Sequence, residues 1–156
     1  MAFVFEQESR LIVTLKKQHS NILLYLNNFN PLLSGKPFSE ATCIVTLREL
    51  RKILVEHLSL EDKELYPALE QSKVKEIRET GRKLSEKMQA ISQKAFDFFN
   101  KYSSMKTSDM TSARFRKELS DLKELIVKRV KLEEEILYPL YRKNPLMTEK
   151  EKRKFS

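Results

Sequence analysis

Four long segments of this chain carry apolar residues at alternating spacings of three and four, and this pattern limits strongly what the chain can fold into. Such spacing is typical of helices that bury one face. Short connections rich in Pro, Gly, Ser or Thr separate the segments and favour antiparallel neighbours. We therefore predict an all-α, up-down-up-down four-helix bundle. The predicted helices are Glu6–Phe29, Ser39–Tyr66, Lys73–Tyr102 and Asp109–Tyr138.

Composition agrees with a helical fold and excludes several classes of protein. The chain has only two glycines and five prolines in 156 residues. Its single cysteine, Cys43, rules out an internal disulfide and suits a reducing cytoplasm, where we expect the protein to be. No window reaches the ~20 apolar residues of a membrane span. The apolar run within the first residues is too short for a signal peptide. We expect one domain over residues 1–141 and a basic tail over residues 142–156.

The charge pattern disfavours nucleic-acid binding and is better explained by a weak attraction to acidic partners. The net charge is +8, but lysines and arginines alternate with acids, as they do on solvated helix faces. No nucleic-acid-reading motif accompanies the charge.

Two further signals predict helix ends. Ser39, followed by Glu40, suits an N-cap, and the pairs Tyr66–Pro67 and Tyr138–Pro139 are predicted to terminate the second and fourth helices.

Each apolar stripe is interrupted at one level by polar or small residues. The interruptions are His19 in the first segment, His57 with Glu61 in the second, Gly81 in the third, and Arg129 with Glu133 in the fourth. His57 and Arg129 each lie about 15 Å before a proline, if a residue adds about 1.5 Å. An up-down bundle places these levels in one plane. Buried carboxylates and imidazoles need a compensating partner, which a metal ion or an arginine can supply.

These residues resemble the hemerythrin-like, HHE cation-binding domain family. The resemblance rests on His19 in LKKQHSNILLYL, on His57 and Glu61 in EHLSLEDKELYP, and on the second Glu-x4-Tyr-Pro element from Glu133 to Pro139. It covers about residues 8–141. The resemblance implies a four-helix bundle that holds two irons through five or more histidines and two bridging carboxylates. It also implies a function that involves dioxygen, nitric oxide or the sensing of iron.

The resemblance assigns roles to individual positions and shows where the site is degenerate. His19 and His57 match ligands of one iron, and Glu61 and Glu133 match the bridging carboxylates. The histidines of the other iron are replaced by Arg129 and by Gly81, with Thr80 and Lys83 as rival positions for the latter. The chain is therefore expected to hold at most one ion, and a diiron oxygen carrier is disfavoured.

Two physical interpretations of the polar layer stay open. In the first, His19, His57, Glu61 and Glu133 bind one Fe, Mn or Zn ion, and the charge of Arg129 replaces the second cation. In the second, no metal binds, and Arg129 pairs with the carboxylates through planar, bidentate hydrogen bonds. The histidines would then be ordinary core residues.

A second resemblance, to the Rsd/AlgQ regulators, favours the metal-free interpretation. It rests on LIVKRVKLEEEIL and MQAISQKAFDFFN, and it implies binding to the primary sigma factor of RNA polymerase. The chain departs from that family in having no tryptophan, in lacking an extra N-terminal stretch and in its positive net charge.

No nucleophile elbow or phosphate-binding glycine loop is present in the sequence. We expect a non-enzymatic sensor or regulator that acts on a protein partner such as a transcription regulator or sigma factor; a metal-dependent redox enzyme is the third hypothesis.

Overall fold

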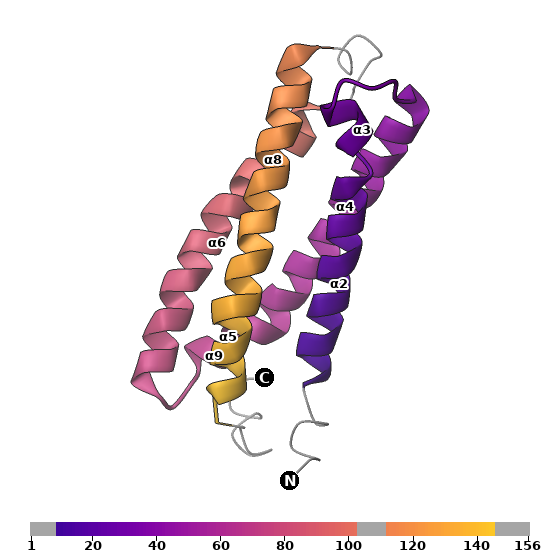
Figure 1. Cartoon of the computed structure of the whole chain (residues 1–156). Helices are drawn as coiled ribbons and strands as arrows, with labels where there is room; N and C mark the ends of the chain where they lie inside the picture. Colours follow the sequence, from indigo (N-terminus) through magenta and orange to yellow (C-terminus); the bar gives the residue numbers. More distant parts are fainter. Residues whose placement is uncertain (1–8, 103–111, 146–156) are drawn as a thin grey trace.

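The chain folds into an antiparallel bundle of four long helices (Figure 1). The computed structural model describes residues 9–102 and 112–145. The all-α, up-down-up-down prediction is confirmed, and the described residues contain no strand. The long helices are α2 (Arg10–Asn27), α4 (Glu40–Leu60), α6 (Lys75–Lys101) and α8 (Ala113–Leu132).

Short elements cover the two ends of the bundle. Helix α3 (Asn30–Leu33) packs against α8 at one end, while α5 (Tyr66–Glu70) and α9 (Tyr138–Lys143) lie at the opposite end (Figure 1). Two π-helical turns, η1 (Glu61–Leu65) and η2 (Glu133–Leu137), join α4 to α5 and α8 to α9. The helices α4 and α8 therefore share similar extensions, as the repeated sequence frame in residues 56–67 and 128–139 indicates.

Serine side chains cap the starts of three long helices. The Ser39 hydroxyl accepts a hydrogen bond from the Thr42 N–H at 3.3 Å, which confirms the predicted N-cap. The Ser112 hydroxyl accepts from the Phe115 N–H at 3.0 Å in the same way, so α8 begins at Ala113. The starts predicted at residues 6 and 109 lie outside the described residues.

The prediction that the Tyr-Pro pairs end helices is wrong. Helical structure continues through Pro67 to Glu70 and through Pro139 to Lys143. A π-helical turn precedes each pair, and each proline stands at the start of the next α-helical segment, where a missing N–H is tolerated. The predicted domain boundary at residue 141 remains a prediction, and most of the predicted basic tail lies outside the described residues.

Two apolar clusters fill the bundle on either side of one polar level. The first cluster includes Phe29, Leu50 and Phe115, and the second includes Leu15 and Leu69. Along the chain, His19, Glu61 and Glu133 each lie between buried residues of one cluster and buried residues of the other. The apolar packing thus holds a polar layer at a fixed height in the bundle.

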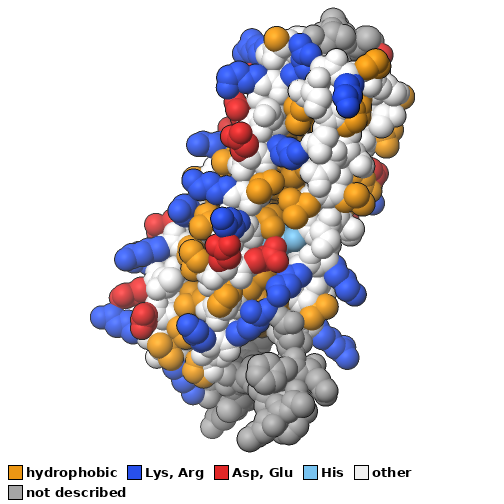
Figure 2. Space-filling model, viewed as in Figure 1, with side chains coloured by type: hydrophobic (Ala, Val, Ile, Leu, Met, Phe, Trp, Pro, Cys, Tyr) orange, Lys and Arg blue, Asp and Glu red, His pale blue; other side chains and the backbone are white. Residues whose placement is uncertain are grey.

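The surface is charged and mixed in sign. Figure 2 shows Lys and Arg side chains interspersed with Asp and Glu over one face, with apolar side chains between them. None of the helices within residues 9–102 and 112–145 has the length and hydrophobicity that crossing a bilayer requires.

Candidate metal centre

The polar layer brings together the charged and imidazole side chains that the sequence places inside the bundle. Each is almost completely shielded from solvent, with exposed fractions of 5% or less. They come from α2, from α4 with η1, and from α8 with η2. The buried members are His19, His57, Glu61, Arg129 and Glu133.

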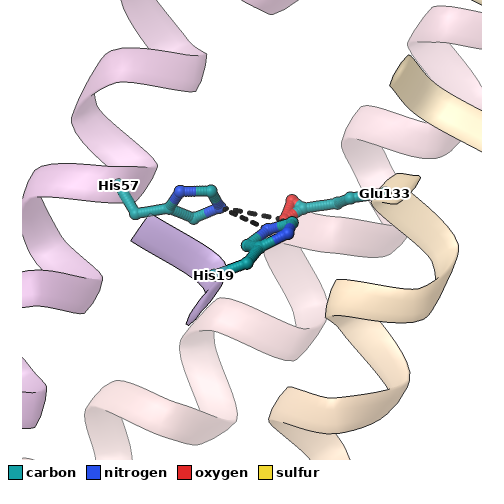
Figure 3. Close-up of side chains that lie close together, drawn as sticks. All are labelled: His19, His57 and Glu133. Atoms are coloured by element: carbon teal, nitrogen blue, oxygen red, sulfur yellow. Dashed lines mark hydrogen bonds and ion pairs between the residues drawn. The ribbon is translucent and has the colours of Figure 1, made fainter. Parts of the chain in front are cut away.

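Three of these side chains point their ligating atoms at one another (Figure 3). The Nε2 atoms of His19 and His57 are 3.1 Å apart. Oε1 of Glu133 lies 3.1 Å from Nε2 of His19 and 3.0 Å from Nε2 of His57. The three atoms form a nearly equilateral triangle in the centre of the bundle.

Hydrogen bonds on the outer side of each ring determine which imidazole nitrogen carries the proton. Nδ1 of His19 is 3.1 Å from Oε2 of Glu134, and Nδ1 of His57 is 2.8 Å from Oε1 of Gln18. Both partners are oxygen acceptors, so each Nδ1 donates its proton outward. Each neutral imidazole therefore directs the unprotonated Nε2 lone pair into the triangle.

The inner triangle consequently consists of three acceptors, and a cation fits it. Two nitrogen lone pairs and a carboxylate oxygen at 3.0–3.1 Å repel one another unless a positive centre lies between them. Atoms that bind a metal at about 2.1 Å lie roughly 3.0–3.4 Å from each other in octahedral or tetrahedral sets. The distances between His19, His57 and Glu133 match that range.

Glu61 lies beside this triangle and is shared with other partners. Its Oε1 is 3.4 Å from Nε2 of His57 and accepts a hydrogen bond from Arg129 at 3.2 Å. Its Oε2 accepts from the Tyr138 hydroxyl at 3.3 Å, and that hydroxyl also lies 3.1 Å from Nε2 of His19. Glu61 is thus placed to complete the set of ligands or to hold a proton next to it.

Burial and mutual contact separate the protonation of the groups in this layer. Burial, together with the nearby charge of Glu133, raises the pKa of Glu61 well above its ordinary value. Although burial raises it, the pKa of Glu133 is held well below its ordinary value by its close contacts with His19, His57 and Glu61. Burial also lowers the pKa of His57. One ionised carboxylate and a neutral imidazole are the forms that bind metals.

The comparison with protein-family models decides the family. The chain matches the model of the "Hemerythrin HHE cation binding domain" over residues 10–141. It belongs to this family. Comparisons with curated proteins and with solved structures gave no significant match. The matched range contains every residue of the polar layer, so the buried His/His/Glu group is the candidate cation site of an HHE domain.

Within this HHE domain, Arg129 occupies the other half of the polar layer. Its terminal nitrogens donate to Oε1 of Glu61 at 3.2 Å, to the Met88 carbonyl at 3.0 Å and to the Ser92 hydroxyl. Its Nε is 3.6 Å from Oε2 of Glu133. The guanidinium therefore places a permanent positive charge against both carboxylates, on the side where the resemblance implies a second iron.

The third long helix, α6, contacts the polar layer through other residues than the predicted Gly81. Gly81 was expected to line the site, but it packs against α5: a Cβ atom there would lie 2.8 Å from Cβ of Leu69. Its role is close helix contact. The part of α6 that reaches Arg129 is about two to three turns further along, at Met88 and Ser92.

Several residues of the site were not predicted. Gln18 precedes one ligand candidate and Glu134 follows another, so each could have been taken for a solvated neighbour. Tyr138 was interpreted as part of a helix terminator, yet its ring stacks on His19 with centroids 5.5 Å apart. The signal that could have identified Tyr138 is its place in the repeated Glu-x4-Tyr-Pro frame.

The two π-helical turns explain that frame. Each turn begins at a buried carboxylate, Glu61 or Glu133, and ends directly before the Tyr-Pro pair. A π turn adds a residue to the helix and changes the direction of the side chains that follow. The tyrosine therefore lies next to the layer that contains its own glutamate, as the hydroxyl contacts of Tyr138 show.

Proposed function

We propose that this HHE domain binds one divalent transition-metal ion, Fe(II), Mn(II) or Zn(II), through His19, His57 and Glu133, with Glu61 beside them. We further propose that the metal serves sensing or regulation, without oxygen carriage or enzymatic turnover. The donor set supports these metals, because two imidazoles and a carboxylate suit all three.

One observation carries the metal proposal. Three potential ligand atoms converge within 3.1 Å of one another, while both outer imidazole nitrogens lie within hydrogen-bond distance of side-chain oxygen atoms. An ordinary pair of core histidines would instead place an N–H of one ring or the other between them and the carboxylate. The outer bonds leave that place to a cation.

The remaining residues prepare the site for one ion. Glu134 and Gln18 fix the orientation and tautomer of the two imidazoles. Arg129 compensates the carboxylates where a second ion would otherwise be needed. A bound ion would supply a Lewis-acidic or redox-active centre. A site with only two imidazoles and a carboxylate supports reversible binding of the metal. The metal-bound and metal-free forms would differ in charge at the centre of the bundle, and that difference could act as the regulatory signal.

Two matched glutamate variants test the metal proposal. Glu133 is completely buried in the triangle, whereas Glu135 lies two residues further along and is exposed. We expect Glu133→Gln to weaken Zn(II) binding at least about tenfold, because ligand residues dominate affinity at such sites. Glu135→Gln should bind Zn(II) as the unchanged protein does. Competition against a chromogenic chelator measures both affinities, and equal affinities in the two variants would refute the site.

A metal-free regulatory module is the second candidate function. The ion pair between Arg129 and Glu61, at 3.2 Å, favours it because this contact stabilises the polar layer without a metal. In that case the protein would act by binding a partner such as the primary sigma factor of RNA polymerase. Direct binding of the purified sigma subunit to metal-free protein, unchanged by added Zn(II), would support this candidate against the first.

A further inference from the structure

The outer face of α2 differs in charge from the rest of the chain. Asp, Glu, Lys and Arg make up 33% of the sequence, yet none of them occurs in residues 18–35. Burial does not account for this gap, because one side of α2 is exposed within this stretch. Figure 2 shows this part of α2 mostly in white and orange. The exposed residues, here called the uncharged face of α2, are Ser20, Asn21, Leu24, Asn27 and the capping Asn28.

Helix propensity does not explain the uncharged face either. Serine and asparagine are weaker helix formers than lysine, arginine and glutamate. The exposed side of α6 carries the stronger formers, among them Arg82, Lys83, Glu86 and Lys87. The composition of the uncharged face therefore disfavours the helix that carries it, which indicates that the face has a role outside α2.

Leu24 lies at the centre of this face. Its exposed fraction of 59% is the highest among the large apolar residues in the described part of the chain. Ser20 and Asn21 lie one turn before it on the same side of the helix, and Asn27 and Asn28 lie one turn after it. An apolar centre with an uncharged polar rim is typical of a protein–protein interface.

The chemistry of the face fits a second copy of the same chain. Each copy has a net charge of +8, so two copies repel one another unless they meet where charges are absent. A carboxamide has both donors and an acceptor, so a row of asparagines can pair with an identical row, whereas a row of lysines cannot. A strongly acidic partner would instead gain from basic side chains, which this face lacks.

We propose that two copies of this chain form a two-fold dimer through the uncharged face of α2. The two α2 helices run antiparallel, and Leu24 contacts the partner subunit's Leu24 at the symmetry axis. A two-fold interface uses the same patch on both subunits, so the patch must be complementary to itself. In this register Asn21 faces the partner subunit's Asn27, and Ser20 faces the partner subunit's Asn28.

Lys17 decides between antiparallel and parallel pairing. It lies on the same side of α2 as Leu24, two turns before it, and is exposed. Parallel helices would bring the two Lys17 side chains together. In the antiparallel pair they lie about 20 Å apart at about 1.5 Å per residue, which is beyond the range of strong repulsion at physiological salt.

Sedimentation of the metal-free, full-length protein tests the dimer without reference to the metal site. Concentrations should reach about 1 mM, at which dimers with micromolar dissociation constants predominate. We expect the unchanged protein to dimerise and Leu24→Glu to associate at least about tenfold more weakly, because two carboxylates would meet at the axis. Val55→Glu is the matched control. It makes the same charge change at an exposed apolar residue beside α6, and it should dimerise normally.

Cysteine cross-linking tests the register. Leu24→Cys should form a disulfide-linked dimer on mild oxidation, because the two positions meet at the axis. Lys17→Cys should not, since Cα atoms about 20 Å apart cannot be bridged by a disulfide. The native Cys43 is buried and leaves the readout to the introduced residue. Circular dichroism of each variant checks that the helices are retained.

Several results would overturn the dimer. A monomer at every concentration would show that the face does not bind a second copy and would assign it to a different protein. Equal association of Leu24→Glu and Val55→Glu would place the contact elsewhere. Faster cross-linking of Lys17→Cys than of Leu24→Cys would contradict the antiparallel register. A dimer that dissociates as salt is raised would be held by charges, which the uncharged face does not have.

Discussion

His19 and His57 face each other across the centre of the bundle with their Nε2 atoms 3.1 Å apart, while their Nδ1 atoms lie 3.1 Å and 2.8 Å from oxygen atoms of Glu134 and Gln18. The outward bonds set the tautomers, and the tautomers make the centre a set of lone pairs. This relationship converts two buried histidines from core residues into candidate ligands.

The outer hydrogen bonds should contribute measurably to metal affinity. We expect Gln18→Leu to weaken Zn(II) binding about 10- to 100-fold, since loss of the partner of a ligand histidine has effects of this size. The bond removed is the one from Nδ1 of His57, at 2.8 Å. Competition with a chelator gives the affinity, and Lys17→Leu, a change at the neighbouring exposed position, is the control. Unchanged affinity in Gln18→Leu would show that this bond does not orient the ring.

Removing the buried arginine should have opposite effects on the fold and on the metal site. Arg129→Met deletes the hydrogen bonds to Glu61 and the Met88 carbonyl. In metal-free protein we expect a loss of about 3–5 kcal/mol in the free energy of unfolding, as for other buried pairs from which one partner is removed.

Zn(II) should restore more stability to Arg129→Met than to the unchanged protein, because the competing positive charge is gone. Urea unfolding with and without Zn(II) measures both effects. Lys128→Met, at the exposed neighbouring position, is the matched control. Metal-independent stability in both proteins would contradict this prediction.

Acidification should remove the metal and then destabilise the protein. The pKa of His57 is lowered from 6.5 by burial, so protons compete with the metal only below that pH. In metal-free protein, the contribution of His57 to stability is complete above pH 6.5 and is lost as the pH falls through the lower pKa of the folded state.

Protonation of Glu133 should also lower the stability of the fold, but at a lower pH than protonation of His57. The pKa of Glu133 is held below the ordinary 4.5 by its contacts with His19, His57 and Glu61, which outweigh the opposing effect of burial, so its contribution is lost as the pH falls below 4.5. Melting temperatures from pH 8 to pH 3, with and without Zn(II), should converge as the metal is released. Zn(II) stabilisation that is already lost above pH 6.5 would contradict the lowered pKa of His57.

Gly81 is expected to resist even the smallest substitution. Alanine has the higher helix propensity by about 1 kcal/mol, yet its Cβ would lie 2.8 Å from Cβ of Leu69, which is far inside van der Waals contact. Gly81→Ala should therefore lower the melting temperature, because α5 must shift away from α6. Lys83→Ala on the exposed face of α6 is the control, with little effect expected. A gain in stability for Gly81→Ala would show that the contact relaxes without cost.

Sequence patterns predicted the bundle well because they record burial directly. The stripe positions His19, His57, Glu61, Arg129 and Glu133 are all buried in one layer, as helical periodicity requires. The level on α6 was missed because a small residue interrupts an apolar stripe in the same way whether it lines a site or admits a neighbouring leucine. Only the contact of Gly81 with Leu69 separates these meanings.

Helix continuation past the prolines was also beyond sequence reasoning. A proline inside a helix usually kinks or breaks it. Here a π turn directly before each Tyr-Pro pair precedes a helix that continues, and the sequence analysis had no signal for such a turn. The contacts of Tyr138 with His19 and Glu61 depend on that turn. The outer partners Gln18 and Glu134 depend on side-chain directions that periodicity does not resolve.

Metal content tests the central claim most directly. Protein without a histidine tag would be loaded anaerobically with Fe(II), freed of excess metal and measured by elemental mass spectrometry, with His57→Ala beside it. Our account predicts about one ion per chain in the unchanged protein, since three converging ligand atoms form one site, and none above background in His57→Ala. No metal in the unchanged protein, two ions per chain, or equal metal in the variant would contradict it.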